Sequence, residues 1–173
     1  MDQALMDLYI NQDFAHAIIK RLLDFQKSYI LQAAMTCGRE LEIVYLSDDM
    51  GMQDRPLMSL SVWEEYFKAP YQELIDLIHS LGMYTFYHSD GAAYEVLASM
   101  VEMGVDIINP IQYVCPGMER EKLKKELGNR VIFHGAVENQ KVLPFGSPEE
   151  VAAEVRENIR ILGQLNDWRF AGR

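Results

Sequence analysis

The stretch Tyr84-Thr85-Phe86-Tyr87-His88-Ser89-Asp90-Gly91 decides how the rest of the chain is interpreted. Its first half is aromatic and β-branched, a composition typical of a buried strand. Its second half turns polar, and a segment with helical spacing follows from Ala92 to Met103. We therefore expect a strand that delivers His88 and Asp90 into a strand-to-helix turn, which is where α/β proteins place their chemistry.

Other segments repeat this design of a strand that ends in polar residues. The predicted strands are residues 41–47, the aromatic first half of 84–91, 105–112 and 130–135. Helical segments alternate with them, which predicts a parallel sheet with right-handed crossovers and an α/β fold. The carboxyl ends of parallel strands share one edge of a sheet. We therefore expect Asp48, His88, Asn109 and His134 to project into a common hollow.

A long helix is predicted before the first strand, from Phe14 to Met35, with Asp13 as its cap and Gly38 after its end. Its apolar positions at helical spacing are Phe14, Ala17, Ile18, Leu22, Phe25, Tyr29 and Ala33. Two further helix starts carry clear capping signals, Ser61-x-x-Glu64 and Ser147-Pro148-Glu149-Glu150. The first of these helices is predicted to run to Ser80 and to break or kink at Pro70.

Composition narrows the class of protein and its partners. The chain has 173 residues, enough for the single domain that we expect over residues 1–173, with 164–173 as a possible irregular tail. A net charge of -10 argues against nucleic acid and anionic membranes as partners. Two cysteines form no disulfide framework, and the sequence has neither a membrane-length apolar run nor a signal peptide, so we expect a cytoplasmic protein.

Several motifs, in the same order and at the same spacing, resemble the uroporphyrinogen decarboxylase superfamily. They are Asp48-Asp49-Met50-Gly51 with Pro56-Leu57-Met58-Ser59, His88-Ser89-Asp90-Gly91, Gly104 to Gln112, Phe133-His134-Gly135-Ala136-Val137, and Leu143 to Val151. The superfamily includes the decarboxylase of haem synthesis and corrinoid-linked methyltransferases that pass methyl groups to a thiol or folate. The resemblance covers nearly the whole chain up to Gly163.

The resemblance implies a (β/α)₈ barrel of the TIM type, of which this chain matches the part from about the fourth to the seventh strand. A full barrel takes ~250 residues, so we expect a partial barrel of about four parallel strands with flanking helices. The early Arg-rich loop of the family, its pyrrole-binding aspartate and its late histidine loop have no counterpart here. A truncated or split member with reduced or no activity alone is therefore the expectation.

Two activities follow from the resemblance. The first is decarboxylation of tetrapyrrole acetate side chains, which needs no cofactor and relies on protonation of the pyrrole ring. The second is methyl transfer, for which relatives bind zinc through a His-x-Cys motif and a later cysteine and work with a corrinoid protein. Asp90 stands at the place of that first cysteine. We therefore expect no metal and favour the decarboxylase, with zinc and a corrinoid protein as the alternative.

The candidate site residues come from the strand ends and the loops that follow them. The candidate catalytic residues are His88, Asp90 and Asp48, and the candidate substrate-binding residues are Asp49, Arg55, Asn109, Gln112, His134 and Glu138. Structural roles compete with these assignments: Asp90 can cap the next helix, His88 can be a satisfied histidine, and Asp48-Asp49 can form a turn. Adjacent aspartates on a strand point to opposite sides, so we expect only one to face the hollow.

Self-association is a third hypothesis, of a different class. Half a barrel exposes two strand edges and an apolar inner face, which favours pairing of two copies into a closed pseudo-barrel. In this reading the chain is an inactive partial barrel that acts through a homo-oligomer. In the enzyme readings the partner is a small molecule, such as a tetrapyrrole.

Overall fold

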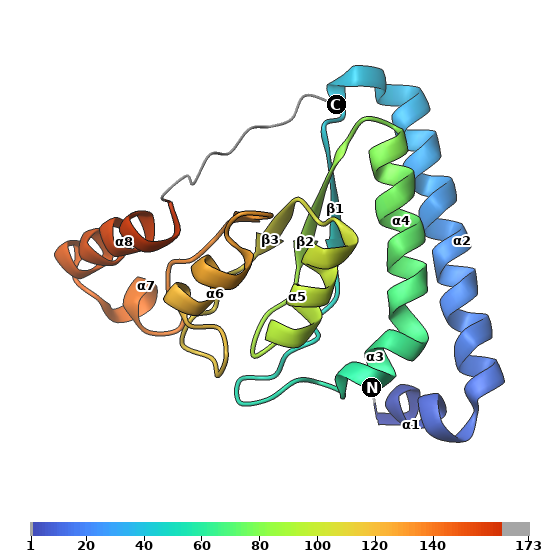
Figure 1. Cartoon of the computed structure of the whole chain (residues 1–173), viewed down its shortest axis with the longest axis horizontal. Coiled ribbons are helices and arrows are strands. Elements are labelled where there is room, and N and C mark those ends of the chain that lie inside the picture. The colour runs from blue at the N-terminus through green and yellow to red at the C-terminus, as the bar shows by residue number, and fades with distance from the viewer. Residues whose placement is uncertain (1, 164–173) are drawn as a thin grey trace. The chain divides into compact units, whose positions relative to one another are not determined.

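The computed structural model describes residues 2–163, and the predicted tail from 164 to 173 lies outside them (Figure 1). The chain divides into two compact units. The first comprises residues 1–44 and 58–85, and the second comprises residues 45–57 and the chain from residue 86 onward. The single domain expected from the sequence stays a prediction. Among the described residues, no helix is long and apolar enough to cross a membrane.

The elements alternate as the sequence predicts. The strands are β1 (Ile43–Ser47), β2 (Tyr84–His88), β3 (Ile107–Asn109) and β4 (Ile132–Phe133). The helices are α1 (Asp2–Ile10), α2 (Gln12–Cys37), η1 (Gly38–Glu40), α3 (Leu60–Trp63), η2 (Glu64–Lys68), α4 (Ala69–Ser80), α5 (Tyr94–Met103), α6 (Arg120–Leu127), α7 (Val142–Phe145) and α8 (Pro148–Leu162).

The strands form one sheet in the order β1-β2-β3-β4, which is also their order in the chain. Phe86 is paired with Ile107 and His88 with Asn109 in a parallel register, and Ile107 is paired with Ile132 in the same sense. The Tyr84 N–H donates to the Glu42 carbonyl, and the Asp48 N–H donates to the His88 carbonyl. Residue numbers thus increase in the same direction along both strands, so β1 is parallel to β2. This all-parallel α/β arrangement confirms the fold class and is that of a partial TIM-type barrel.

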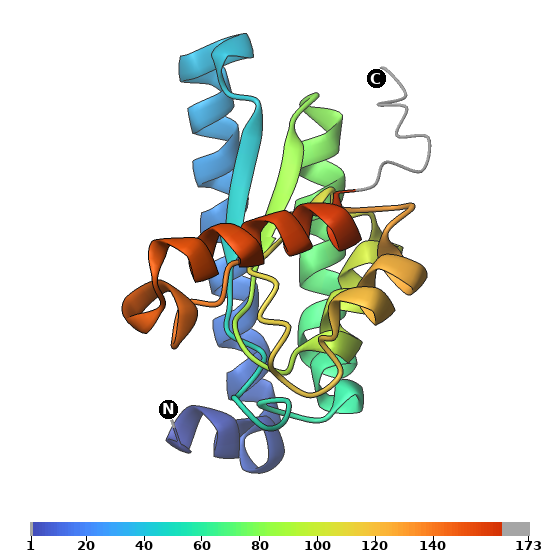
Figure 2. The ribbon, with the colours of Figure 1, turned by 90° about the vertical axis from the view of Figure 1, so that its left-hand side faces the viewer.

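In the first unit, α2 lies along α4, and α1 folds against the start of α2 (Figures 1 and 2). Leu8 and Ala15 form a small core with Val62 and Tyr66. The predicted break at Pro70 takes another form. The π-helical segment η2 precedes α4, and Pro70 lies at the beginning of α4. A wider π turn accommodates a residue that has no N–H to donate, so the helical path continues through the proline.

The two faces of the sheet are used differently. Along β2 the odd positions Thr85 and Tyr87 are fully buried, whereas Phe86 and His88 are half-buried. Helices α5 and α6 lie on one face of the sheet (Figures 1 and 2). The alternation of a strand directs Tyr87 to one face and His88 to the other. His88 therefore reaches the face that corresponds to the interior of a barrel.

Two strands are shorter than predicted, and one predicted loop contains a helix. β3 ends at Asn109, because Pro110 has no N–H to continue the ladder, and β4 has 2 residues. The predicted loop from 136 to 146 contains the short helix α7. By contrast, α8 begins as predicted: the Ser147 side chain accepts from the Glu150 N–H, and the Glu150 carboxylate accepts from the Ser147 N–H.

Candidate active site at the strand ends

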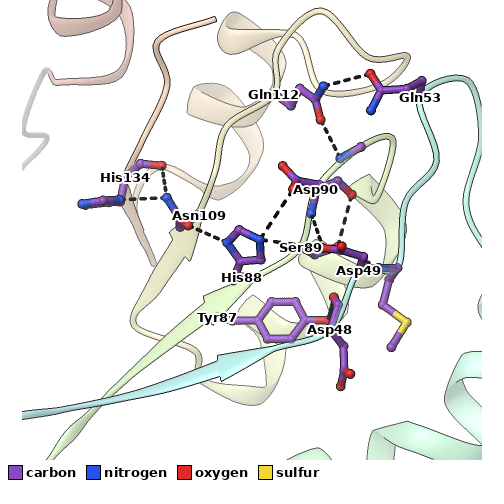
Figure 3. Close-up of polar contacts among 12 residues, drawn as sticks. Asp48, Asp49, Gln53, Tyr87, His88, Ser89, Asp90, Asn109, Gln112 and His134 are labelled. Carbon is purple, nitrogen blue, oxygen red and sulfur yellow. Dashed lines mark hydrogen bonds and ion pairs between the residues drawn. The ribbon is translucent and has the colours of Figure 1, made fainter. Parts of the chain in front are cut away.

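Five of the predicted side chains meet at the carboxyl ends of the strands: Asp49, His88, Asp90, Asn109 and His134 (Figure 3). We call this group the strand-end cluster. β2 delivers His88, β3 delivers Asn109, and His134 follows β4 directly. The side chains of His88, Asp90 and Asp49 expose 22%, 44% and 62% of their surface, respectively, so the cluster is open to a ligand.

Hydrogen bonds from Asn109 fix the orientation of the two histidines. Its Oδ1 lies 2.7 Å from Nδ1 of His88, and its Nδ2 lies 2.8 Å from Nδ1 of His134. Because an amide Nδ2 can only donate, Nδ1 of His134 accepts, and Oδ1 is left to accept the Nδ1–H of His88. The other ring nitrogen of His88, Nε2, then faces the two carboxylates (Figure 3).

The carboxylates of Asp49 and Asp90 lie on either side of this nitrogen. His88 Nε2 is 3.7 Å from Asp49 Oδ1 and 3.6 Å from Asp90 Oδ2. Each carboxylate attracts positive charge, so a proton on Nε2 or a cation at this point is stabilised by both. The arrangement can therefore hold a proton for transfer, or a metal ion.

Two glycines allow the loops after β1 and β2 to touch through their backbones. A Cβ at Gly51 would lie 2.5 Å from the Asp90 carbonyl oxygen, and one at Gly91 would lie 2.5 Å from that of Met52. Gly91 also has a φ of +81°, which L side chains rarely adopt. This contact places Asp49 beside Asp90, whose N–H donates to Asp49 Oδ1 at 3.2 Å.

Asp48, the third predicted catalytic residue, is not a member of the strand-end cluster. Its carboxylate points away from His88, whereas that of its neighbour Asp49 points toward it (Figure 3). Desolvation, followed by the charge of Asp49, raises the pKa of Asp48 to about 6. Asp48 keeps a solvent-exposed part, but protein atoms crowd around its carboxylate. Asp48 and Asp49 thus point to opposite sides, as expected for adjacent residues on a strand (Figure 3).

Gln112 lies beside the cluster and braces the loop after β2. Its Oε1 accepts from the Gly91 N–H at 2.8 Å, and its Nε2 donates to Gln53 Oε1 at 2.9 Å. Both ends of the amide are therefore used within the protein. This suits a residue that positions Gly91 and Asp90.

Glu138 and Arg55 make other contacts. The carboxylate of Glu138 accepts from the N–H groups of Gln140, Lys141 and Val142 at 2.8, 2.6 and 2.8 Å. Burial by itself would raise the pKa of Glu138, but these N–H donors lower it. Arg55 lies in an exposed loop, and its Nη1 is 3.1 Å from Asp54. Glu138 thus caps the start of α7, and Arg55 forms a surface ion pair.

Sequence reasoning missed several residues that support the site. Gln53 accepts from both Gln112 and Gln140, and the buried Ser89 accepts the Met50 N–H at 2.9 Å. The sequence carried one indication of the position of Ser89: alternation along β2 places it on the same buried side as Tyr87. The sequence placed Tyr45 on a strand but did not indicate its neighbours. Its ring centroid lies 5.8 Å from that of His88 and 5.3 Å from that of Phe86.

A comparison with known families agrees with this geometry. The sequence model described as uroporphyrinogen decarboxylase (URO-D) matches residues 1–168, nearly the whole chain. No curated protein and no solved structure matches the chain. The match spans the strands and the loops that carry the strand-end cluster, and the chain belongs to the uroporphyrinogen decarboxylase family.

Proposed function

We propose that the strand-end cluster transfers a proton to an electron-rich aromatic carboxylic acid, so that the protein is a uroporphyrinogen decarboxylase-like lyase. One observation carries this proposal: His88 presents Nε2 to two carboxylates while Asn109 holds its Nδ1. An imidazolium in this position is stabilised on one side and oriented on the other. Those are the two properties required of a general acid.

The aromatic side chains next to His88 suit a flat substrate. Tyr45 exposes 57% of its surface, and its ring lies beside those of Phe86 and His88. Phe86 in turn makes an edge contact with His134. In this proposal a pyrrole ring of the substrate packs on Tyr45, beside His88. Aromatic pairs of this kind add about 0.5–1.5 kcal/mol beyond the burial of area.

The proton balance of the reaction assigns His88 its role. His88 gives a proton to the ring, the bond between the methylene carbon and the carboxylate breaks, and its electron pair neutralises the ring as carbon dioxide leaves. The methylene carbon then takes up a proton from solvent to become a methyl group, and the ring carbon gives its proton back to His88. One proton is consumed for each carbon dioxide released, and Asp49 and Asp90 stabilise the charged histidine between turnovers.

Binding and turnover are measured separately. We expect the purified chain to bind uroporphyrin, a stable oxidised analogue of the substrate, in a calorimetric titration. Tyr45→Ala should weaken this binding about tenfold, since it removes the stacking surface. Chromatography of products after incubation with uroporphyrinogen tests turnover, and His88→Gln should abolish it. A chain that neither binds uroporphyrin nor shortens the acetate side chains contradicts the proposal.

Methyl transfer with a bound zinc ion is the second candidate, and the spacing of the cluster favours it. One ligand atom each from Asp49, His88 and Asp90 lies within 4.8 Å of the others. A tetrahedral zinc ion about 2.1 Å from its ligands separates them by about 3.4 Å, close to the His–Asp distances seen here. These residues would hold the ion, which would supply Lewis-acid activation of an acceptor thiol.

Zinc content after dialysis decides between the two candidates. Methyl transfer predicts one zinc per chain, lost in His88→Ala and Asp49→Asn and kept in Asp48→Asn. The last variant is the matched control, because it removes the same charge from the neighbouring residue whose carboxylate points away. If the wild-type chain carries no zinc and takes up none, this candidate is wrong and the decarboxylase remains.

A further inference from the structure

A pocket lies in the second unit, outside the strand-end cluster. Helices α6 and α7 both contact α8, and residues of the three helices and of the segments beside them line a cavity of about 600 Å³. This volume is in the range of sites that bind small molecules. We call it the α8 pocket; its charged lining residues are Arg120, Lys141, Glu150, Glu154 and Glu157. No residue of the strand-end cluster lines it, so the two sites are separate.

The guanidinium of Arg120 is held in one orientation. Its Cζ lies 3.6 Å from the centroid of the Tyr113 ring, and its Nη1 donates to Asn158 Oδ1 at 2.8 Å. Asn158 is 8% exposed, and its Nδ2 donates to the Ala136 carbonyl oxygen at 2.8 Å, which turns its Oδ1 toward Arg120. Within the described residues, none of the other N–H groups of this guanidinium forms a hydrogen bond. Arg120 therefore offers prearranged donors to a ligand.

The three carboxylates of the pocket already accept hydrogen bonds from the protein. Glu154 accepts from the Tyr113 hydroxyl, which lies 2.9 Å from both carboxylate oxygens. Glu157 accepts from Nε and Nη2 of Arg160 at 2.7 and 2.5 Å. Glu150 accepts at 2.7 Å from the N–H of the residue that caps α8. A cationic ligand would have to compete with these donors, so the carboxylates do not make this a cation site.

The two cations, by contrast, are available to an anion. Among residues 2–163, the Lys141 ammonium forms no hydrogen bond or ion pair, and Arg120 forms no ion pair. The planar fork of an arginine matches a carboxylate through two parallel hydrogen bonds. Three carboxylates in the same lining disfavour a doubly charged group such as a phosphate, because each repels it. A singly charged carboxylate is therefore the anion that fits best.

An exposed aromatic ring lines the same pocket. Phe145 exposes 84% of its surface, and Val142 lines the pocket with it. An aromatic ligand packed on Phe145 would remove this apolar surface from water. We propose that the α8 pocket binds a small aromatic monocarboxylate, with its carboxylate on Arg120 and Lys141 and its ring on Phe145. This site does not depend on the lyase activity proposed for the strand-end cluster.

Calorimetric titration of the full chain with naphthoate tests the pocket. Naphthamide has the same ring without the charge and is the control ligand. We expect naphthoate to bind, and naphthamide to bind at least about tenfold more weakly, since hydrogen bonds to a charged group are the stronger ones. Added salt should weaken the binding of naphthoate, because it screens the two cations. Equal affinities for the two ligands, or no binding of naphthoate at millimolar concentration, would overturn the proposal.

Variants locate the bound naphthoate. Arg120→Gln should weaken binding about tenfold, and Phe145→Ala should weaken it severalfold at an exposed position where the fold tolerates the change. Arg156→Gln is the matched control, since Arg156 is exposed on α8 outside the pocket, and it should bind as the wild type. Circular dichroism confirms that each variant keeps its helices.

His88→Gln separates this pocket from the strand-end cluster. It should bind naphthoate as the wild type does, even if the chain shows no decarboxylase activity. If His88→Gln loses naphthoate while Arg120→Gln and Phe145→Ala keep it, the ligand lies in the strand-end cluster and the α8 pocket is not its site.

Discussion

The second unit gathers its polar side chains at the strand ends, whereas the first unit leaves a row of large apolar side chains on α2 in contact with solvent. His88 is held on one side by Asn109, and the loops around it touch through Gly51 and Gly91. Nothing comparable fixes Phe25 or Tyr29 within the described part of one chain beyond their own stacking. The polar side chains at the strand ends are thus held in place by other residues, whereas the large apolar side chains of α2 remain uncovered.

This difference teaches that regular spacing and burial are separate properties. The apolar residues predicted along α2 do recur at helical spacing, yet six of the seven are exposed, and the buried positions Leu23 and Ile30 come from a different face. At the strand ends the pattern is less regular, but each polar residue is carried to its place by a strand of the parallel sheet.

The largest expected effect compares a glycine of each region. Gly91 and Gly82 have similar φ values of +81° and +78°, but a Cβ would meet backbone at 2.5 Å in Gly91 and nothing within 4 Å in Gly82. We expect Gly91→Ala to lower the free energy of unfolding by about 3–4 kcal/mol and Gly82→Ala by about 1 kcal/mol. Urea denaturation measures both. If the two variants lose equal amounts of unfolding free energy, the close backbone contact at Gly91 adds no cost beyond that of the positive φ.

Two adjacent leucines on α2 sharpen the comparison within one helix. Leu23 is 7% exposed and Leu22 is 56% exposed. We expect Leu23→Ala to cost about 2–3 kcal/mol of unfolding free energy, because it removes buried contacts. Leu22→Ala should change it by less than about 0.5 kcal/mol, because the Leu22 side chain is exposed. A cost for Leu22→Ala as large as that for Leu23→Ala would show that this face of α2 is covered.

Asn109 tests how strongly the site depends on orientation. Asn109→Ala removes the partner of both His88 and His134 and leaves His88 free to rotate. We expect affinity for a ligand of the cluster, uroporphyrin or zinc, to fall about tenfold, the effect usual for residues that orient a functional histidine. Asn129→Ala, at an exposed position, is the control. If Asn109→Ala binds the ligand with unchanged affinity, Asn109 does not orient His88 for binding and has a structural role only.

The smallest effect concerns Asp48. A pKa raised from 3.8 to about 6 means that the folded protein binds the Asp48 proton more tightly than the unfolded chain does. Stability from this group is therefore present below pH 4 and lost as the pH rises through 6. The full shift corresponds to about 3 kcal/mol, but partial exposure screens the charge, and we expect about 1 kcal/mol.

Asp48→Asn should accordingly raise the free energy of unfolding at pH 7 by about that amount and leave it little changed at pH 4. Denaturation at the two pH values measures the difference. Asp54→Asn, at an exposed loop position, should show no such pH dependence. A destabilised Asp48→Asn at pH 7 would indicate that the ionised carboxylate has a favourable contact in the fold.

The sequence alone determined the order of the elements, the parallel sheet and most of the strand-end cluster. Alternation along β2 and the polar residues after each strand are local patterns, and a parallel sheet brings such ends together by its topology. The capping box of α8 was equally readable, because it depends on neighbours in the chain.

Only the tertiary structure decided the rest. Which of Asp48 and Asp49 turns to His88, the capping role of Glu138, and the use of Gln53 as a shared acceptor depend on loops that meet across long sequence separations. The choice of the buried face on α2 depends in the same way on where α1 and α4 lie. Helical spacing shows that a face is apolar, but burial requires another element to cover it.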